Sequence, residues 1–580
     1  MESQPEYDVV IARNVMVPMR DGVRLATDVY RPARHGEPVS GPFPVILTRT
    51  PYDKSARAAV EESEFWARRG YMRVIQDVRG RYASEGTFYL IKDEGPDGYD
   101  TVEWAGTQAW SDGQVGMIGT SYLAWVQNAA AVHNPPHLKA IWPNQGGANG
   151  LTSSLRQGGA LELRWLGWSF WGGASSKEAK GNAAVGAAME DGAIHLRDWL
   201  LRLPWKEGRT PLAAIPDYER WALDYYRKAT FEEGMWDSTA LNFEWHAERH
   251  ADVAATYSGG WYDSYTRATC ENFMTFTKLK KSPQRMIIGP WTHGDDTLAL
   301  RHSGHVDLGD AAPVNGNLAE DFSHLMLRFF DYQLKGLKNG WDADASVKIF
   351  VMGGGSGRRL ASGRLDHGGR WRDEQAWPLA RAVETAFYLH EDGSLRTTQP
   401  GAHEASSSFD FDPANPVPTI SANISSLEEV VPAPEGTWMP TEGRSRSVVT
   451  PGGRHQAEAP DVFMAKPPYL PLASRQDVLV FQTEPLPAPV EVTGPVTVRL
   501  WVSSDAADTD FTAKLLDIYP PSEDWPGGYH LNLTDSILRL RFHGGADRER
   551  FVKPGHLAEI EIELYPTGNV FAAGHRIRLD

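Results

Sequence analysis

The sequence predicts an α/β fold built on a parallel sheet, with a helical insertion and a C-terminal all-β region. Three observations predict it. Short apolar runs alternate with segments of helical spacing up to about residue 146, a helical stretch then interrupts that alternation, and short strands with frequent turns dominate beyond residue 347. A chain of 580 residues is also too long for one hydrophobic core, so several domains are expected.

The first region opens with a predicted β-hairpin. Residues 15–32 alternate apolar and polar side chains around Asp21-Gly22, which is typical of two strands joined by a tight turn. Apolar, β-branched runs then predict buried strands at 42–50, 71–80, 115–119 and 138–146. Helical spacing between these runs, as in 59–70, indicates a parallel sheet covered on both faces.

The pattern changes twice further along the chain. Residues 150–245 contain helix formers and many of the 21 tryptophans, and predict a helical insertion, or cap, that could wall an aromatic cavity. Strand-like runs return at 253–263 and 285–293, and a helix is expected at 325–337. We expect an α/β domain in two parts, 1–146 and 246–346, with a cap at 147–245 between them. A C-terminal domain is expected at 347–580.

The C-terminal region reads as a jelly-roll β-sandwich. Segments such as "VTVRLWVSS" and "LAEIEIELYPTG" alternate apolar and polar residues, and Gly, Pro and Asp mark the turns between them. The stretch 399–475 is rich in Pro, Ser and Glu and has weak periodicity, so long loops crossing the sandwich are expected there.

Composition excludes several classes of function. The net charge of −17, from 75 acidic and 58 basic residues, disfavours nucleic-acid binding, which needs a basic face. No run of 18 apolar residues indicates a membrane span, and the acidic N-terminus does not resemble a signal peptide, so a cytoplasmic location is expected. The single cysteine, Cys270, cannot form an internal disulfide and is expected to be a small buried side chain.

The stretch "VGMIGTSYLAW" contains the candidate nucleophile, Ser121. A serine hydroxyl needs a base, an acid that orients the base, and hydrogen-bond donors for the oxyanion. Ser121 follows a short strand and precedes a helical pattern, the strand–turn–helix context of a nucleophile elbow. The usual motif closes with glycine, and Leu123 occupies that position here, so the stretch alone leaves an ordinary turn serine open.

The acid and the base are predicted from their order along the chain. Asp263 ends one later strand-like run and His293 ends the next, which gives the order nucleophile, acid, base expected for such a sheet. The rival acids Asp252 and Asp295 lie before their strand and after the histidine, respectively. The rival histidines lie in polar or helix-end positions: His133, His137, His302 and His305.

At this point the sequence resembles a known family. The motifs "RTPYDK" (49–54), "DVRGRYASEG" (77–86), "WSDGQVGMIGTSY" (110–122), "GGWYDSY" (259–265) and "IIGPWTHG" (287–294) are similar to the CocE/NonD hydrolases of the cocaine esterase and X-Pro dipeptidyl-peptidase type. The C-terminal stretch 493–520 is similar too. The resemblance covers nearly the whole chain.

The resemblance implies a fold and a set of roles. It implies an α/β-hydrolase domain with a helical cap and a C-terminal jelly roll, a Ser121–His293–Asp263 triad, and an oxyanion hole formed by the Tyr52 hydroxyl and the Tyr122 backbone N–H. It implies no metal or organic cofactor. We further expect an acyl pocket walled by Trp165, Trp168, Trp171 and Tyr265, although plain packing of the cap core is an equal alternative for the tryptophans.

Two recurrent arginines of the second motif have a structural interpretation. We expect Arg79 or Arg81 to pair with a buried carboxylate, and an anion site for a substrate carboxylate is the alternative. Other classes of function also stay open at this point. The hydrolase domain could be inert beside a carbohydrate-binding jelly roll, and "HGDD" (293–296) is a weak hint of a metal-dependent hydrolase.

The residues after Asp263 bear on the substrate. Relatives that act on amino acid esters carry acidic residues there, whereas this chain has Ser264, Tyr265, Thr266 and Arg267. The sequence therefore disfavours an α-amino acid ester hydrolase or dipeptidyl-peptidase. We expect a carboxylesterase for aryl or alkyl esters with an uncharged or anionic acyl group, and an amide acylase of the glutaryl-cephalosporin acylase type as the alternative. The expected partner is a small-molecule substrate, and a homo-oligomer stays open.

Overall fold

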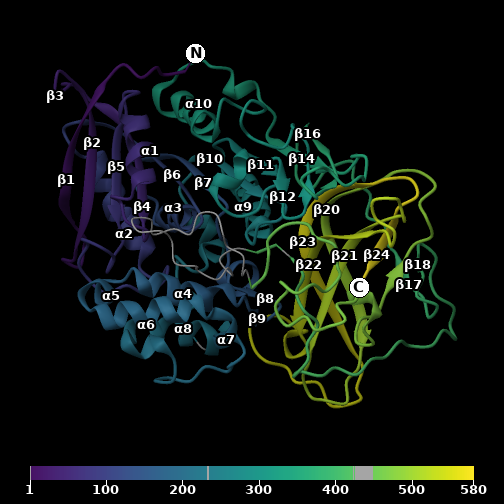
Figure 1. Ribbon diagram of the computed structural model, residues 1–580. Coiled ribbons are helices and arrows are strands. Elements are labelled where there is room, and N and C mark those ends of the chain that lie inside the picture. The colour runs from purple at the N-terminus through teal and green to yellow at the C-terminus, as the bar shows by residue number, and fades with distance from the viewer. Residues whose placement is uncertain (1, 232–233, 422, 425–447) are drawn as a thin grey trace.

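The computed structural model describes residues 2–231, 234–421, 423–424 and 448–580. Figure 1 shows a large sheet with its helices, a group of cap helices at one end of that sheet, and a separate body of C-terminal strands.

The α/β domain has one twisted sheet in which the central strands are parallel. The sheet order is β1-β2-β5-β4-β6-β7-β10-β11-β14, with β1 and β2 antiparallel to their neighbours. The turn between β1 and β2 contains Asp21-Gly22, so the predicted hairpin is confirmed. The strands are β1 (Asp8–Pro18), β2 (Arg24–Arg34), β4 (Phe43–Thr50), β5 (Met72–Asp77), β6 (Ser111–Thr120), β7 (Leu138–Asn144), β10 (Ala254–Gly260), β11 (Gln284–Gly289) and β14 (Val347–Met352).

Helices cover both faces of this sheet because its strands are apolar on both sides. Ile46 and Ile118 pack with Phe330 on one face, and Leu47 and Met117 lie in the cluster on the other face. This is the alternation that successive strand residues produce. The covering helices are α1 (Arg57–Ala67) and α10 (Phe322–Lys335) on the first face, and α2 (Glu94–Gly106), α3 (Tyr122–Val132) and α9 (Thr266–Leu279) on the second.

The cap between β7 and β10 is mainly helical, as predicted. It begins with a π-helical turn at Gly150–Ser154 and a short hairpin, β8 (Arg156–Gln157) and β9 (Ala160–Leu161). Buried tryptophans such as Trp221 and Trp236 form much of its core. Its helices are α4 (Arg164–Ala174), α5 (Lys177–Gly181), α6 (Ala183–Ile194), α7 (Leu196–Leu200) and α8 (Pro216–Arg227).

The C-terminal domain consists of antiparallel strands. β20 pairs with β23, and a second sheet has the order β19-β24-β21-β22. The jelly-roll topology itself stays a prediction. The strands are β19 (Phe481–Gln482), β20 (Val490–Val502), β21 (Asp510–Tyr519), β22 (Tyr529–Arg539), β23 (Ala558–Phe571) and β24 (Arg576–Leu579).

One strand lies on the other side of the predicted domain boundary. The sequence analysis places residues from 347 onward in the C-terminal domain, whereas β14 extends the large sheet by pairing in parallel with β11. β16 (Gly369–Glu374) pairs with β14, and Met352 of β14 meets Asn569 of β23. The two domains are therefore joined through a continuous sheet, a pairing that single-sequence periodicity does not reveal.

The long predicted loop region is described only in part. Residues 425–447 of the stretch 399–475 lie outside the described residues. The described remainder consists of loops and turns, with isolated β-bridges at Gly453, His455 and Ala457 and a short helical turn at Leu472–Ser474. In the described part of the chain, no helix has the length and apolar character needed to span a membrane.

Candidate active site

Ser121 occupies a strained turn between β6 and α3. Its backbone has φ 64° and ψ −121°, a conformation that a residue with a side chain adopts only when its surroundings enforce it. The Ser121 N–H donates to the Asn144 carbonyl at 3.0 Å, which fixes the turn to the neighbouring strand β7. The turn therefore has the geometry of a nucleophile elbow, with the serine at the carboxyl edge of the sheet.

Gly119 explains why the elbow tolerates Leu123 at its closing position. Gly119 has φ 140°, and a Cβ atom there would lie 2.4 Å from the Cβ of Leu123. The missing side chain at position 119 therefore provides the space in which Leu123 packs. One glycine before the serine is sufficient for this turn, and the second glycine of the usual motif is not needed.

Asp263 and His293 form a direct pair. Asp263 follows β10, His293 follows β11, and the Nδ1 atom of His293 donates to Oδ1 of Asp263 at 3.0 Å. Asp263 is completely buried, and its Oδ1 also accepts from the Tyr265 backbone N–H at 3.1 Å. An aspartate that holds Nδ1–H leaves Nε2 of the same ring as the basic nitrogen.

The rival acids and histidines have other partners. Asp252 accepts from the backbone N–H groups of Lys281 and Ser282 in an exposed turn. Asp295 bonds Thr120 and Asn144, close to the elbow, and among the described residues it forms no hydrogen bond with a histidine ring. His137 pairs with Glu103 and His133 meets Thr239, each remote from Ser121 in the fold.

Gln145 is a residue near the site that sequence reasoning missed. Its side-chain oxygen accepts from the Gly294 N–H at 2.7 Å, and its amide donates to the Thr292 carbonyl at 2.9 Å. These two bonds bracket His293. The only sequence signal is the place of Gln145 immediately after a strand, next to Asn144, and that signal is too general to assign the role.

Tyr52 lies against Ser121. Burial, the largest effect, raises the pKa of Tyr52, while hydrogen bonding with the Trp168 and Ser121 side chains lowers it by less. The phenol is therefore protonated at neutral pH and faces the serine hydroxyl. Its ring contacts Trp171, with ring centroids 5.6 Å apart.

Tyr122 directs its ring away from the reaction. The ring is buried, its hydroxyl donates to Oε1 of Glu94 at 2.5 Å, and the same hydroxyl accepts from the Ile91 N–H at 3.2 Å. Burial, followed by the charge of Glu94, raises the pKa of Tyr122 well above its ordinary value. Tyr122 is also the first residue of α3, and the first N–H groups of a helix have no intrahelical acceptor. Only its backbone N–H is placed to bind an oxyanion.

A narrow pocket opens beside Ser121. Its volume is about 10 Å³, about the space of one water molecule. Of the residues predicted for this pocket, Trp171 alone is absent from its wall. Trp171 packs behind the wall against Tyr52 and Trp168, whose centroid lies 6.0 Å from its own. The wall is formed by Tyr52, Ser121, Tyr122, Arg164, Trp165, Trp168 and Tyr265.

Arg164 is the second functional residue that the sequence analysis missed. It is buried, and its guanidinium lies over the rings of Trp165 and Tyr265 at 4.5 and 4.6 Å. Nη1 donates to the Tyr265 hydroxyl at 3.2 Å, and Nε pairs with Glu162. Burial is the largest single effect and disfavours the charge, but Glu162 and Tyr265 together outweigh it, so the pKa of Arg164 is raised. A lone cation in the apolar run "RWLGWSFWGG" was the available signal.

Arg267 is not the cation of this pocket. It pairs with Glu271 at 2.9 Å and with Glu563 of the C-terminal domain, so its charge is compensated away from Ser121. The C-terminal domain also reaches the pocket indirectly. The Tyr565 hydroxyl donates to Oε1 of Glu162 at 3.2 Å, and Glu162 in turn holds Arg164.

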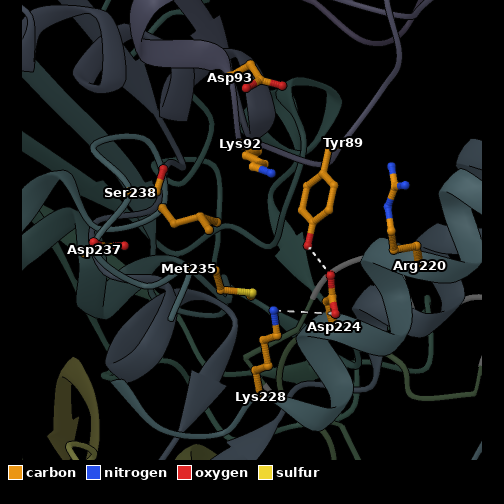
Figure 2. A pocket seen from close by; sticks show the side chains of 10 residues that line it. Tyr89, Lys92, Asp93, Arg220, Asp224, Lys228, Met235, Asp237 and Ser238 are labelled. Carbon is orange, nitrogen blue, oxygen red and sulfur yellow. Dashed lines mark hydrogen bonds and ion pairs between the residues drawn. The ribbon is translucent and has the colours of Figure 1, made fainter. Parts of the chain in front are cut away.

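A larger cavity of about 620 Å³ lies between the cap and the segment before α2 (Figure 2). The Tyr89 hydroxyl points to Asp224 and donates to it at 2.9 Å, and Lys228 approaches the same carboxylate at 3.7 Å. Lys92 and Arg220 add positive charge, while Asp93 and Asp237 balance it. The cavity shares no lining residue with the pocket at Ser121, and its mixed charges indicate no single class of ligand.

Of the two recurrent arginines, Arg79 has the buried carboxylate that was expected as a partner and Arg81 has neutral partners. Arg79 donates to both oxygens of buried Asp97, at 3.0 and 2.7 Å. Arg81 is buried and donates to the carbonyls of Pro51 and Gly172, both at 2.9 Å. Arg81 thus connects the Tyr52 loop with the cap. Among the described residues, no three His, Cys, Asp or Glu side chains gather closely enough to hold a metal ion.

Comparisons with known proteins agree with this geometry. Residues 21–295 match the family model of the X-Pro dipeptidyl-peptidases (S15 family), and residues 339–580 match the model of the X-Pro dipeptidyl-peptidase C-terminal non-catalytic domain. The chain is 35% identical to the cocaine esterase of Rhodococcus sp. (strain MB1 Bresler), across 98% of this chain and 89% of that protein. The chain belongs to the CocE/NonD family of serine hydrolases.

Solved structures share the fold of this CocE/NonD hydrolase. An α-amino acid ester hydrolase superposes with a TM-score of 0.69 at 23% identity, covering 99% of this chain and 89% of the other. A CocE/NonD family hydrolase from Staphylococcus aureus superposes with a TM-score of 0.63 at 18% identity, covering 98% and 85%. The α/β-hydrolase fold with a C-terminal domain of antiparallel strands is thereby confirmed, and the family places the chain among the serine ester hydrolases.

Proposed function

We propose that this protein is a serine carboxylesterase that forms an acyl-enzyme on Ser121. The observation that carries the proposal is the Asp263–His293 hydrogen bond of 3.0 Å, at the sheet edge where Ser121 occupies its strained turn. An oriented histidine and a serine lifted out of the sheet are what nucleophilic acyl transfer requires. The 35% identity to a cocaine esterase supports ester cleavage as the reaction.

The proposed reaction proceeds in two acyl-transfer steps. His293 removes the proton of Ser121 as the serine oxygen attacks the ester carbonyl, and Asp263 stabilises the imidazolium that forms. The Tyr52 hydroxyl and the Tyr122 N–H bind the oxyanion of the tetrahedral intermediate. His293 then protonates the departing alcohol. In the second step it activates the water that hydrolyses the acyl-enzyme and frees Ser121.

The residues that line the pocket favour some acyl groups over others by charge and by size. Arg164 brings a buried positive charge to its wall, and no carboxylate is among the residues that line it. Glu162 pairs with Arg164 from outside the lining, so the wall itself offers an ammonium no carboxylate and places it beside a guanidinium. Uncharged or anionic acyl groups are therefore favoured. Large aromatic side chains form most of the wall, so a longer acyl chain must displace more of them than a short one.

The test is covalent labelling of the nucleophile together with turnover. Wild-type protein should hydrolyse p-nitrophenyl acetate and react with a fluorophosphonate at Ser121, as located by peptide mass spectrometry. Ser121→Ala should lose both while keeping its unfolding temperature. Ser63→Ala is the control, because Ser63 only donates to the Ala59 carbonyl within α1. Wild-type turnover in Ser121→Ala, or labelling at another residue, would overturn the proposal.

The charge preference has its own measurement. We compare p-nitrophenyl esters of acetic, butyric and succinic acid with the ester of glycine, whose acyl group carries an ammonium. The expected order of kcat/KM places acetate first and the glycine ester last. Equal or faster hydrolysis of the glycine ester would refute the role assigned to Arg164, and it would leave the acyl-enzyme mechanism intact.

A further inference from the structure

The buried carboxylate of Glu94, at the start of α2, bonds one residue in each of the two segments that supply the proposed oxyanion donors. Its Oε1 accepts from the Tyr122 hydroxyl at 2.5 Å, and its Oε2 accepts from Nη1 of Arg49 at 2.5 Å. Tyr122 follows the nucleophile directly. Arg49 lies near the end of β4, three residues before Tyr52. Glu94 therefore contacts the two chain segments that supply the two donors.

The surroundings leave these groups little freedom. Glu94, Arg49 and Tyr122 are buried, and Arg49 also donates to the Glu94 carbonyl at 3.1 Å and to the Gln76 side chain at 2.9 Å. The ring centroids of Tyr52 and Tyr122 lie 6.4 Å apart in an edge-to-face contact. Hydrogen bonds with charged partners in a buried setting are short and directional, so they hold both segments firmly.

We propose that Glu94 is a positioning residue that sets the separation of the Tyr52 hydroxyl and the Tyr122 backbone N–H. The inference rests on the proposed function, because it assigns a task only if these groups bind an oxyanion. Glu94 does not touch substrate. It fixes the Tyr122 ring, and through the ring the first turn of α3, while Arg49 fixes the strand end that leads to Tyr52.

Misplacement of an oxyanion donor affects the transition state more than the bound substrate. The oxyanion exists only after attack, so a shifted donor lowers kcat and leaves ground-state binding nearly unchanged. A displacement of about 1 Å can reduce a rate about 10²-fold. A purely structural role of Glu94 predicts a different result, namely a lower unfolding temperature with unchanged kcat in the folded fraction.

The test uses Glu94→Gln, which keeps the shape and removes the charge, and Tyr122→Phe, which removes the donor to Glu94. With p-nitrophenyl acetate, Glu94→Gln should lower kcat about 10- to 100-fold with KM within about threefold of wild type. Affinity for a boronic acid, which forms a tetrahedral adduct on a catalytic serine, should fall in parallel with kcat. Tyr122→Phe should show a smaller loss, since Arg49 still holds the other donor.

The double variant Glu94→Gln/Tyr122→Phe makes the test sharper, because the effects of substitutions within one hydrogen-bond network do not add. Its kcat should equal that of Glu94→Gln, with no further loss from Tyr122→Phe. Glu94→Asp, which keeps the charge but shortens the side chain, gives a second folded variant with an intermediate kcat. If Glu94→Gln does not fold, the coupling of Tyr122→Phe with Glu94→Asp decides the question in the same way.

A matched control lies on the opposite face of the sheet. Asp331 in α10 is a buried carboxylate that accepts from the Tyr71 hydroxyl at 2.7 Å. Asp331→Asn and Tyr71→Phe should lower the unfolding temperature and leave kcat unchanged. Wild-type kcat in folded Glu94→Gln, additive losses in the double variant, or an equal loss in Asp331→Asn would each overturn the inference. Failure of wild type to label at Ser121 would instead overturn the proposed function.

Discussion

The Nδ1 atom of His293 lies 3.0 Å from Oδ1 of completely buried Asp263, and Gln145 bonds the backbone on both sides of the histidine. The Asp263 carboxylate therefore holds the imidazole ring, and the Gln145 amide holds the backbone next to His293. Because Asp263 accepts the Nδ1 proton, the neutral ring presents Nε2 as the base. The predictions that follow concern this base, the oxyanion donor Tyr52 and a buried histidine elsewhere in the fold.

Asp263→Asn tests the orientation of the base. The amide of asparagine can donate to Nδ1 and so stabilise the tautomer whose Nε2 carries the proton, which cannot accept a proton from serine. We expect kcat to fall about 10⁴-fold with a KM close to wild type, as for loss of the orienting acid in other triads. Stopped assays with p-nitrophenyl acetate measure this.

The control for this variant is Asp252→Asn, because Asp252 caps an exposed turn at Lys281 and Ser282. It should keep wild-type kcat. If Asp263→Asn retained more than a tenth of wild-type kcat, Asp263 would not be the orienting acid, and Asp295→Asn would be the next variant to examine because Asp295 bonds Thr120 beside the elbow.

Tyr52→Phe tests the oxyanion hole. The phenol is kept protonated because burial raises its pKa, so it is a donor throughout the neutral range. Removing one oxyanion donor lowers kcat by about 10²–10³-fold in enzymes of this type. We expect that loss with little change in KM, measured with p-nitrophenyl acetate between pH 6 and 9.

Tyr225→Phe is the matched control for Tyr52→Phe. Tyr225 is also buried, and its hydroxyl donates to the Leu90 carbonyl at 2.5 Å, outside the pocket at Ser121. It should lose stability of about 1 kcal/mol and keep its kcat. Equal effects of the two variants on kcat would remove Tyr52 from the hole.

His250 gives the protein an acid-labile component of stability. Burial lowers the pKa of His250 to about 3, and its Nδ1 bonds the Ala251 carbonyl at 2.8 Å. The folded state therefore resists protonation, and the unfolded state protonates near the ordinary pKa of 6.5. The contribution of neutral His250 to the free energy of unfolding is complete above pH 6.5 and is lost as the pH falls toward 3.

At pH 5 this loss amounts to about 2 kcal/mol for a buried histidine. His250→Gln, which does not titrate, should therefore be destabilised less by a change from pH 7.5 to pH 5 than wild type, as measured by urea unfolding at each pH. His403→Gln, at an exposed position, should keep the wild-type pH dependence. An identical pH dependence in His250→Gln and wild type would contradict the assignment.

Much of the site could be predicted because its order along the chain is local information. Ser121 directly precedes a helix, Asp263 and His293 lie in the loops that follow two strands, and strand ends are visible as apolar runs followed by polar residues. Parallel strands bring these ends to one edge, so the order in the chain was enough to group them. The motifs around Tyr52 and Tyr122 added the two donors only through family resemblance.

Arg164, Gln145 and Glu94 were missed for a common reason. Each acts on a residue far from it in sequence: Arg164 on Tyr265, Gln145 on Thr292 and Gly294, and Glu94 on Arg49 and Tyr122. A polar residue in an apolar helix, after a strand or at a helix start has many ordinary explanations. Only the packed structure shows which backbone or side-chain atoms contact such a residue.

From the sequence alone we could predict the fold class, a helical cap, and Ser121, Asp263 and His293 as candidate nucleophile, acid and base. These depend on periodicity and on chain order, which neighbouring residues encode. The tertiary structure alone decided that β14 belongs to the catalytic sheet, that Trp171 lies behind the pocket wall, and that Arg164 rather than Arg267 is the cation beside Ser121. The direction and the partner of a side chain depend on contacts between segments that lie far apart in the chain.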